Sequence, residues 1–508
     1  MNTSLAQIIY NSTLSYLDTV PRSERKKIGQ FFTPASIATY MGTMSQCFKD
    51  TVCVLDPGAG SGILSAAIVD KLIAENVTCI HLDVYENNAG ILSLLKKNLE
   101  LIQKTAQQSG VQLKYCIYEN NFIESNQFAW TGIARNEKYD VVICNPPYKK
   151  IGKSDVESRV MSDIVYGQPN LYFLFMAMGI SLLKHGGEFI YIVPRSFSSG
   201  LYFTAFRNWF TRTMRITNLH LFTSREAVSG AKDCVLQETV ILRAEKAADY
   251  PDTIEVTESA GEDCRIINRY YVDYHTCVRS GENSFLFFPA SEEDINALEF
   301  VSRWPASLPM LGCRMKTGMV VDFRETEWMR TDPDDSMIPL LWAYNFSKNR
   351  IYFPVSIEGK PQYLLDTKET QRLRMKKGNY LLLKRFTSKE EKKRLQCSLV
   401  LEEDFSSYPA ISTENHLNFI TKVTGSMSRE ELYGLFVVLN SSCMDRYFRI
   451  LNGSTQVNAN EINAAPFPAY RDIVQMGRKS ILSQSLSEET CDAILGEQFD
   501  YAVIRKAI

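Results

Sequence analysis

The tetrapeptide Asn145-Pro146-Pro147-Tyr148 combines residue types that can bind an amino group on a planar ring. Two consecutive prolines fix the backbone and remove two N–H donors, so the carbonyl groups of this loop meet little competition from its own amides. Asn145 adds a side-chain acceptor and Tyr148 adds a flat aromatic face. Acceptors beside a stacking ring suit the exocyclic amino group of a nucleic-acid base. The plainer alternative is a proline turn that ends a strand.

A second set of residues has the composition of a nucleotide-binding loop. Asp56, Gly58, Gly60 and Gly62 occupy alternate positions after an apolar run, and glycines let a ligand approach the backbone closely. The spacing differs from the dinucleotide fingerprint, and no lysine follows as in a phosphate-binding loop. Asp56 therefore suits an amino-acid ammonium group, and Glu86 suits two ribose hydroxyls. Ammonium, ribose and adenine together describe S-adenosylmethionine as the cofactor.

The segment Gly29–Pro34 precedes both motifs and predicts the start of a helix. Thr33 is expected at the N-cap and Pro34 at the first helical position. A helix N-terminus favours a carboxylate or another anion, which would suit one end of the cofactor. A helix start with no ligand is the alternative.

Short apolar runs alternate with helical patterns from residue 51 to about residue 246, which predicts a mostly parallel sheet covered on both faces. The seven expected strands are 52–55, 79–85, 113–118, 139–144, 188–193, 216–222 and 236–243, and the expected helices are 63–74, 91–104, 171–183 and 204–211. Each motif then follows the C-terminal end of a strand, where open α/β sheets bind their ligands.

The alternation stops after residue 246, which predicts a second domain. Residues 247–263 are polar and acidic and are interpreted as a linker, and 264–508 as a mixed α+β domain with helices over 430–450 and 478–497. Basic residues gather at 372–377 and 384–394, the latter around Phe386. We expect the second cluster to contact phosphates; a solvated helix face is the alternative.

Composition limits the classes of function. The chain has 508 residues, enough for two domains, and a formal net charge of −2, so any surface for nucleic acid must be local. Its 12 cysteines form no C-x-x-C pair, and its five histidines are dispersed, which predicts reduced thiols and no metal site. No leader and no membrane span are expected. The predicted location is the cytoplasm.

Taken in order, these motifs resemble those of the amino-methyltransferases, and more narrowly the gamma-class adenine-N6 DNA methyltransferases of type II restriction–modification systems. The resemblance implies a Rossmann-like methyltransferase fold over 1–246 with a seven-stranded sheet. It assigns the catalytic motif to Asn145–Tyr148 and a stacking role, opposite Tyr148, to Phe222. The residues it assigns to the cofactor are Phe32, Thr33, Pro34, Asp56, Gly58, Gly60, Glu86, Asn121, Phe122 and Asn145, with Asn170–Phe173 lining the pocket.

One position departs from that family. Its members usually carry an aspartate before the phenylalanine at the end of the third strand, where the carboxylate accepts from the cofactor's adenine amino group. Here Asn121 precedes Phe122. The amide carbonyl can still accept a hydrogen bond, but the negative charge is absent. We expect cofactor binding to be retained and weaker.

The C-terminal half resembles a subgroup, the BsuBI/PstI-like modification enzymes, in Lys316–Arg324, Leu383–Glu391, Glu414–Asn418 and Ser454–Asn458. The resemblance implies a target-recognition domain that binds double-stranded DNA at a short palindromic site such as CTGCAG, with a separate cognate endonuclease. The residues expected to contact DNA are Lys316, Arg324, Lys384, Arg385, Lys389, Gln456 and Asn458.

The implied function is transfer of a methyl group to the N6 amino group of a flipped-out adenine, without a metal. Three alternatives stay open. The first is an amino-methyltransferase that acts on RNA or protein, because Asn-Pro-Pro-Tyr also occurs there. The second is a fusion of restriction and methylation, since Pro333-Asp334 and Glu358-Gly359-Lys360 imitate a nuclease signature. The third is a DNA-binding relative that has lost turnover.

Overall fold

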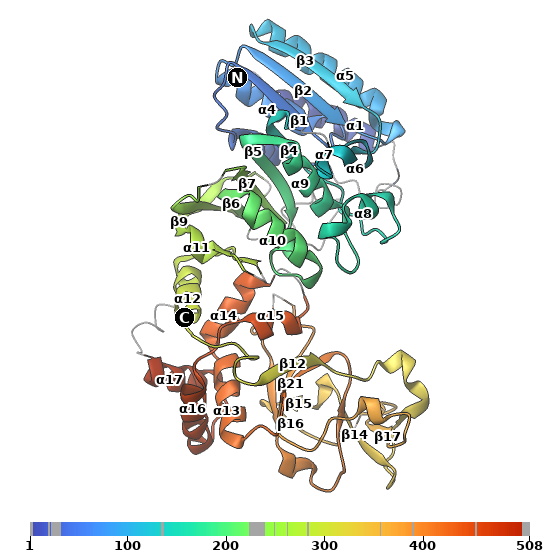
Figure 1. Ribbon diagram of the computed structural model, residues 1–508, viewed down its shortest axis with the longest axis vertical. Coiled ribbons are helices and arrows are strands. Elements are labelled where there is room, and N and C mark those ends of the chain that lie inside the picture. Colours follow the sequence, from blue (N-terminus) through green and yellow to red (C-terminus); the bar gives the residue numbers. More distant parts are fainter. Residues whose placement is uncertain are drawn as a thin grey trace. The chain divides into compact units, whose positions relative to one another are not determined.

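The computed structural model shows two compact units, Met1–Ala290 and Ser291–Ile508 (Figure 1). The structure describes residues 4–18, 21, 32–133, 137–222, 239–247, 249–261, 263–281, 284–355, 357–388, 391–452 and 455–499.

The first unit is built on a nine-stranded sheet in the order β3-β2-β1-β4-β5-β7-β6-β8-β9. Neighbouring strands are parallel from β3 to β5, and β7 is antiparallel to both β5 and β6. The strands are β1 Thr51–Asp56, β2 Cys79–Tyr85, β3 Gln112–Tyr118, β4 Tyr139–Cys144, β5 Leu183–Pro194, β6 Arg215–Phe222, β7 Thr239–Glu245, β8 Thr253–Ser259 and β9 Ile266–Asp273. A small hairpin joins β10 Val278–Arg279 to β11 Phe285–Leu286.

Helices cover both faces of this sheet, as expected for buried parallel strands. On one face, Ile9, Met41, Ile68 and Leu99 pack with strand residues such as Val54 in one buried cluster. On the other face, Phe210 of α10 (Thr204–Thr213) packs against Phe189 of β5. The Tyr191 hydroxyl of β5 donates to the Phe175 carbonyl of α9 (Leu171–Ser181). The helices of this unit are α1 Leu5–Leu17, α3 Ala35–Thr43, α4 Ile63–Ala74, α5 Ala89–Gln108, α6 Phe122–Ser125, α7 Gln127–Trp130, α8 Val156–Val160, α9 Leu171–Ser181, α10 Thr204–Thr213 and α11 Tyr274–Cys277.

The mostly parallel Rossmann-like sheet is confirmed, but it has nine strands instead of the seven predicted, and the predicted linker is wrong. Residues 247–263 contain β8, which pairs in parallel with β6, and β9 then pairs with β8. The acidic residues of this segment disguise a strand whose Ile254 and Val256 are fully buried. β9 is an exposed edge strand, so it lacks a clear apolar pattern. The first unit therefore extends to Ala290 instead of residue 246.

The second unit mixes two sheets with helices, as expected of an α+β domain. One sheet has the strand order β12-β21-β18-β19-β16-β15 and the other β13-β17-β14-β20. The strands are β12 Cys313–Thr317, β13 Met329–Arg330, β14 Met337–Leu341, β15 Phe346–Ser347, β16 Arg350–Ile351, β17 Tyr363–Leu365, β18 Tyr380–Lys384, β19 Cys397–Val400, β20 Ser412–Thr413 and β21 Leu417–Lys422.

The helices of the second unit are α12 Glu292–Ser302, α13 Arg429–Leu439, α14 Ser442–Leu451, α15 Ala459–Ala464, α16 Tyr470–Ser483 and α17 Glu488–Phe499. The single closing helix predicted over 478–497 is therefore wrong, because the chain turns between α16 and α17. Gln484 makes that turn with a left-handed φ of 54°. Among the described helices, none is long and apolar enough to cross a membrane.

Candidate functional site

A cavity of about 480 Å³ opens at the C-terminal ends of β1, β2, β3 and β4 in the first unit. Its volume falls in the range usual for small-molecule sites. It brings together most of the residues predicted to bind the cofactor or to form the catalytic motif. Those in its wall are Phe32, Thr33, Gly58, Gly60, Glu86, Asn121, Phe122, Asn145, Pro146 and Pro147. Predicted site residues that lie outside this wall are Pro34, Asp56, Tyr148 and Phe222. Of Asn170–Phe173, which was predicted to line the pocket, Leu171 is in the wall and the other three residues are not.

The glycine loop connects β1 to α4 and is tied to the next strand by a carboxylate. Gly60 and Gly62 have φ values of 54° and 86°, which glycine adopts without strain. The Gly60 amide donates to Glu86 Oε2 at 3.0 Å, and the Asn88 amide donates to Glu86 Oε1 at 2.8 Å. Burial raises the pKa of Glu86, and these amides partly offset that rise. The carboxylate therefore holds the loop against the wall of the cavity.

Asp56 lies beneath the glycine loop and is fully buried. Its Oδ2 accepts a hydrogen bond from Ser65 Oγ at 2.8 Å, which fixes the start of α4. Burial raises the pKa of Asp56 to about 7. The contact with an ammonium group that the sequence predicts for Asp56 stays a prediction, because the side chain supports the loop from below.

Asn145 follows β4 and is anchored to the N-terminal segment. Its Nδ2 donates to Thr33 Oγ1 at 3.0 Å. The predicted cap is therefore wrong: Pro34 is the N-cap of α3, and the helix begins at Ala35. The Thr33 hydroxyl is directed to Asn145 instead of the helix amides. This hydrogen bond orients the Asn145 amide so that its Oδ1 points away from Thr33.

The two predicted stacking residues differ in how they are held. The Tyr148 hydroxyl donates to the Ile192 carbonyl at 3.0 Å, and its ring meets that of Tyr172 edge-on at 6.2 Å. Burial raises the pKa of Tyr148 well above its usual value. Phe222 ends β6 and contacts the His220 ring at 4.9 Å. The segment that follows it, 223–238, lies outside the described residues, and stacking by either ring stays a prediction.

The end of β3 contains a contact that the sequence did not indicate. Asn121 caps α6, and its Oδ1 accepts from the amides of Ile123 at 3.0 Å and Glu124 at 3.2 Å. Its Nδ2 donates to Glu157 Oε1 at 2.7 Å, and Glu157 lines the cavity. Glu157 belongs to the five-residue helix α8 and to no recognisable motif, so no sequence signal could have identified it.

Phe122, the neighbour of Asn121, supplies an apolar wall at the same strand end. Its ring lies 5.0 Å from that of Tyr85 and 5.2 Å from that of Phe175. Such rings suit a flat heterocycle. Glycine backbone, a carboxylate at the β2 end and aromatic rings at the β3 end therefore fit an adenosyl amino acid such as S-adenosylmethionine.

In the second unit, the four stretches shared with the BsuBI/PstI-like group lie side by side. The Gly318 amide donates to the Leu417 carbonyl at 2.8 Å. Phe386 pairs with Gln456 in an antiparallel bridge. Asn418 Nδ2 donates to the Val457 carbonyl at 2.7 Å. Stretches 39 to 99 residues apart at these contacts thus come together. We name their described residues the recognition surface.

The recognition surface carries exposed aromatic and cationic groups. Phe386 is 41% exposed, and its ring lies 5.0 Å from that of His416. Arg385 Nη1 donates to the Asn415 carbonyl at 3.0 Å. Lys316 and Arg324 are exposed, and Lys384, Gln456 and Asn458 are partly exposed. Lys389 lies outside the described residues.

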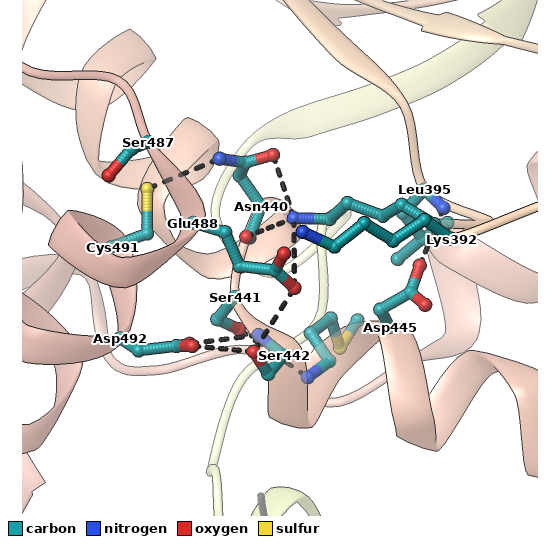
Figure 2. Close-up of polar contacts among 12 residues, drawn as sticks. Lys392, Leu395, Asn440, Ser441, Ser442, Asp445, Ser487, Glu488, Cys491 and Asp492 are labelled. Atoms are coloured by element: carbon teal, nitrogen blue, oxygen red, sulfur yellow. Dashed lines mark hydrogen bonds and ion pairs between the residues drawn. The ribbon is translucent and has the colours of Figure 1, made fainter.

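Two cations of the predicted phosphate-binding cluster are structural instead. Arg394 is fully buried, and its guanidinium donates to Thr387 Oγ1 and Asn452 Oδ1. Lys393 Nζ donates to Asn440 Oδ1 at 2.8 Å and lies 3.7 Å from Glu488. Figure 2 shows Asn440 and Glu488, the two residues that receive this cation. The expectation that the whole run 384–394 faces phosphates is therefore wrong, because its last two cations hold helices α13, α14 and α17.

The first part of the nuclease-like signature, Pro333-Asp334, lies in a turn. Asp334 Oδ1 accepts from the Ser336 amide at 2.7 Å, which forms a tight turn. Among the residues that the structure describes, no group of three or more histidine, cysteine or acidic side chains could hold a metal ion.

Comparison of the chain with known proteins identifies its family. Residues 69–228 match the family model described as Eco57I restriction-modification methylase. The type II methyltransferase M.BsuBI of Bacillus subtilis is 31% identical over 482 residues, which cover 93% of this chain and 94% of that protein. M.PstI of Providencia stuartii is 30% identical over 451 residues, which cover 89% of this chain and 89% of that protein. The solved type IIG restriction endonuclease BpuSI aligns with a TM-score of 0.40 at 16% identity, over 94% of this chain and 65% of that one.

Likeness to M.BsuBI and M.PstI extends through both units, and the cavity of the first unit has the groups that an adenosyl cofactor needs. The chain belongs to the type II DNA methyltransferases of restriction–modification systems, in the BsuBI/PstI-like group, and S-adenosylmethionine is its cofactor.

Proposed function

We propose that this DNA methyltransferase methylates the N6 amino group of an adenine that is flipped out of a short duplex site. One observation carries the proposal. Asn145 is anchored by Thr33 in the wall of the cavity that also contains the glycine loop and Glu86. An acceptor for an amino group thus borders the cofactor cavity.

The cofactor spans the strand ends from β1 to β3 in this proposal. Its amino-acid part lies at Gly58 and Gly60, near Phe32 and Thr33. Its ribose hydroxyls bind Glu86, whose oxygens accept from backbone amides such as those of Gly60 and Asn88 and retain further acceptor capacity. Its adenine then reaches the β3 end beside Phe122. When bound, the cofactor supplies the methyl group as an electrophile.

The flipped adenine enters beside Asn145. The Asn145 side-chain carbonyl and the Pro146 backbone carbonyl accept hydrogen bonds from its amino group, which directs the nitrogen lone pair toward the cofactor. Stacking on Tyr148 and Phe222 offsets a flipping cost of a few kcal/mol. Positioning and electrostatic arrangement supply the catalysis, and no covalent intermediate or metal is required.

The recognition surface selects the DNA site. Lys316, Arg324, Lys384 and Arg385 contact phosphates, and Gln456 and Asn458 are candidates for contacts with base edges. The proposed site is a short palindrome such as CTGCAG. Methylation there protects host DNA from a separate cognate endonuclease.

The proposal is tested by incubating unmodified bacterial DNA with the purified protein and S-adenosylmethionine, followed by single-molecule sequencing. We expect N6-methyladenine at one short motif. Methylcytosine at a defined motif would contradict the base and retain the DNA substrate. No modified base, with the protein folded and cofactor-bound, would redirect the search to RNA and protein acceptors.

A further inference from the structure

Asn121 stands where the family usually carries the aspartate that accepts from the cofactor's adenine, but the structure occupies its carbonyl elsewhere. Oδ1 accepts from two backbone amides at the start of α6. A carbonyl oxygen has two lone pairs, so both are used. The amide nitrogen is a donor, and it cannot accept from an adenine amino group. Asn121 is thus poorly suited to the role of the missing aspartate.

Glu157 offers what Asn121 lacks. It lines the same cavity, together with Asn121 and Phe122. Its Oε1 accepts from Asn121 Nδ2 at 2.7 Å. An ionised carboxylate has about four acceptor positions, so one hydrogen bond from Asn121 leaves capacity for a ligand. The single donor also restrains the carboxylate, which reduces the entropy lost when a ligand binds.

The position of this carboxylate indicates which part of the cofactor it meets. The cavity runs past the ends of β1, β2 and β3, which lie in that order in the sheet. A cofactor with its amino acid at the glycine loop and its ribose at Glu86 extends its adenine beyond β2. That end is bordered by Asn121, Phe122 and Glu157. The exocyclic amino group lies on the edge of adenine and donates hydrogen bonds, and a carboxylate is a strong acceptor for them.

We propose that Glu157 accepts the exocyclic amino group of the cofactor's adenine, and that Asn121 is the positioning residue that holds Glu157 in place. The charge missing at residue 121 is restored from a different element, helix α8. This inference rests on the cofactor orientation given under the proposed function.

The test compares two ligands that differ at positions 1 and 6 of the purine, because the inosyl base also carries a proton at N1. S-adenosylhomocysteine presents an amino donor at position 6 of the purine, whereas S-inosylhomocysteine presents an oxo acceptor there. Calorimetry on the full chain should show that the wild type prefers the adenosyl ligand by at least about tenfold, as expected for a hydrogen bond to a charged group. Glu157→Gln should lose most of that preference, because an amide can donate to the oxo group.

Glu124→Gln is the matched control, since Glu124 is an exposed glutamate on α6 outside the cavity wall. Its preference between the ligands should equal that of the wild type. If Glu157→Gln weakened both ligands by the same factor, Glu157 would be only a structural partner of Asn121. Unchanged affinities would exclude the contact altogether.

A second variant keeps the inference testable if Glu157→Gln does not fold. Asn121→Asp preserves the cap, because aspartate is a good N-cap residue. It also removes the donor and places a second carboxylate against Glu157. We expect weaker binding of S-adenosylhomocysteine, whereas a direct acceptor at residue 121 would bind it more tightly. No binding by the folded wild type would refute the cofactor site itself; binding without these changes would refute only the role of Glu157.

Discussion

At the scale of single residues, a substitution of Asn145 should lower the rate of methyl transfer and leave DNA affinity nearly unchanged. Asn145→Ala removes the side-chain acceptor proposed for the target amino group, and loss of one such transition-state contact typically costs about 10²–10³-fold in rate. We expect single-turnover methyl transfer to fall by about that factor, with DNA affinity within about threefold because phosphate contacts dominate affinity. Thr33→Val, which removes only the anchor of Nδ2, should cause a smaller loss. Near-normal turnover in Asn145→Ala would refute the mechanism.

Asp56 predicts an unusual pH dependence of stability. Its pKa is about 7 in the folded protein, because burial disfavours the charge, and near 3.8 in its ordinary state. The folded state therefore binds more protons than the unfolded state between these values, and stability falls as pH rises through that window. Asp56→Asn, which does not titrate, should gain roughly 2–3 kcal/mol over the wild type between pH 5 and pH 8.

Urea unfolding of both proteins at several pH values measures this difference. The exposed Asp50 provides the control, and Asp50→Asn should follow the wild type at every pH. A constant offset between Asp56→Asn and the wild type would show that Asp56 does not titrate in this range.

At the scale of elements, His220 connects strands β6 and β8. Its two ring nitrogens lie 2.9 Å from Thr257 Oγ1 and 3.0 Å from Ser259 Oγ. Burial lowers the pKa of His220 to about 4. Below about pH 6.5, His220 binds a proton in the unfolded state but not in the folded state. Stability therefore falls as pH drops from 6.5 toward 4.

The loss of unfolding free energy between pH 6.5 and pH 4 should reach about 3 kcal/mol. It should be smaller in His220→Gln, which has no titratable ring. The comparison uses the slope of unfolding free energy against pH, since the substitution also changes packing. His185→Gln, at an exposed position, is the control. Equal slopes for all three proteins would exclude His220 as the group responsible.

The sequence predicted elements wherever burial produced a simple pattern. Strand β4 is buried along its length, and its apolar run is unambiguous. Strand β9 was missed because its apolar residues do not alternate with polar ones, and most of them are exposed, Ile266 and Ile267 included. Thr33 was assigned to a helix cap because composition does not show that its hydroxyl meets Asn145, 112 residues away. Glu157 was missed for the same reason, since only tertiary structure brings α8 to Asn121.

At the scale of the whole molecule, the net charge of −2 means that DNA affinity depends on local cations. Replacing Lys384 and Arg385 with glutamine should remove up to two phosphate contacts. The slope of log affinity against log salt should flatten by about 0.9 per contact. Fluorescence anisotropy with a duplex, between about 50 and 200 mM salt, measures it.

Lys479→Gln is the control, because Lys479 lies on α16 and pairs with Glu497. It should leave the slope unchanged. If the slope were unchanged in the double variant as well, Lys384 and Arg385 would be solvated side chains that do not contact phosphates.

The hydrogen bond between Thr33 and Asn145 also has a consequence for the order of events during synthesis. Ribosomes add about 5–20 residues per second, so the 112 residues between the two partners take roughly 6–20 s to appear. Strand β1 likewise emerges well before its central neighbour β4. A nascent chain therefore exposes the N-terminal wall of the pocket before the opposite wall exists, and the cofactor cannot assist folding until β4 has left the ribosome.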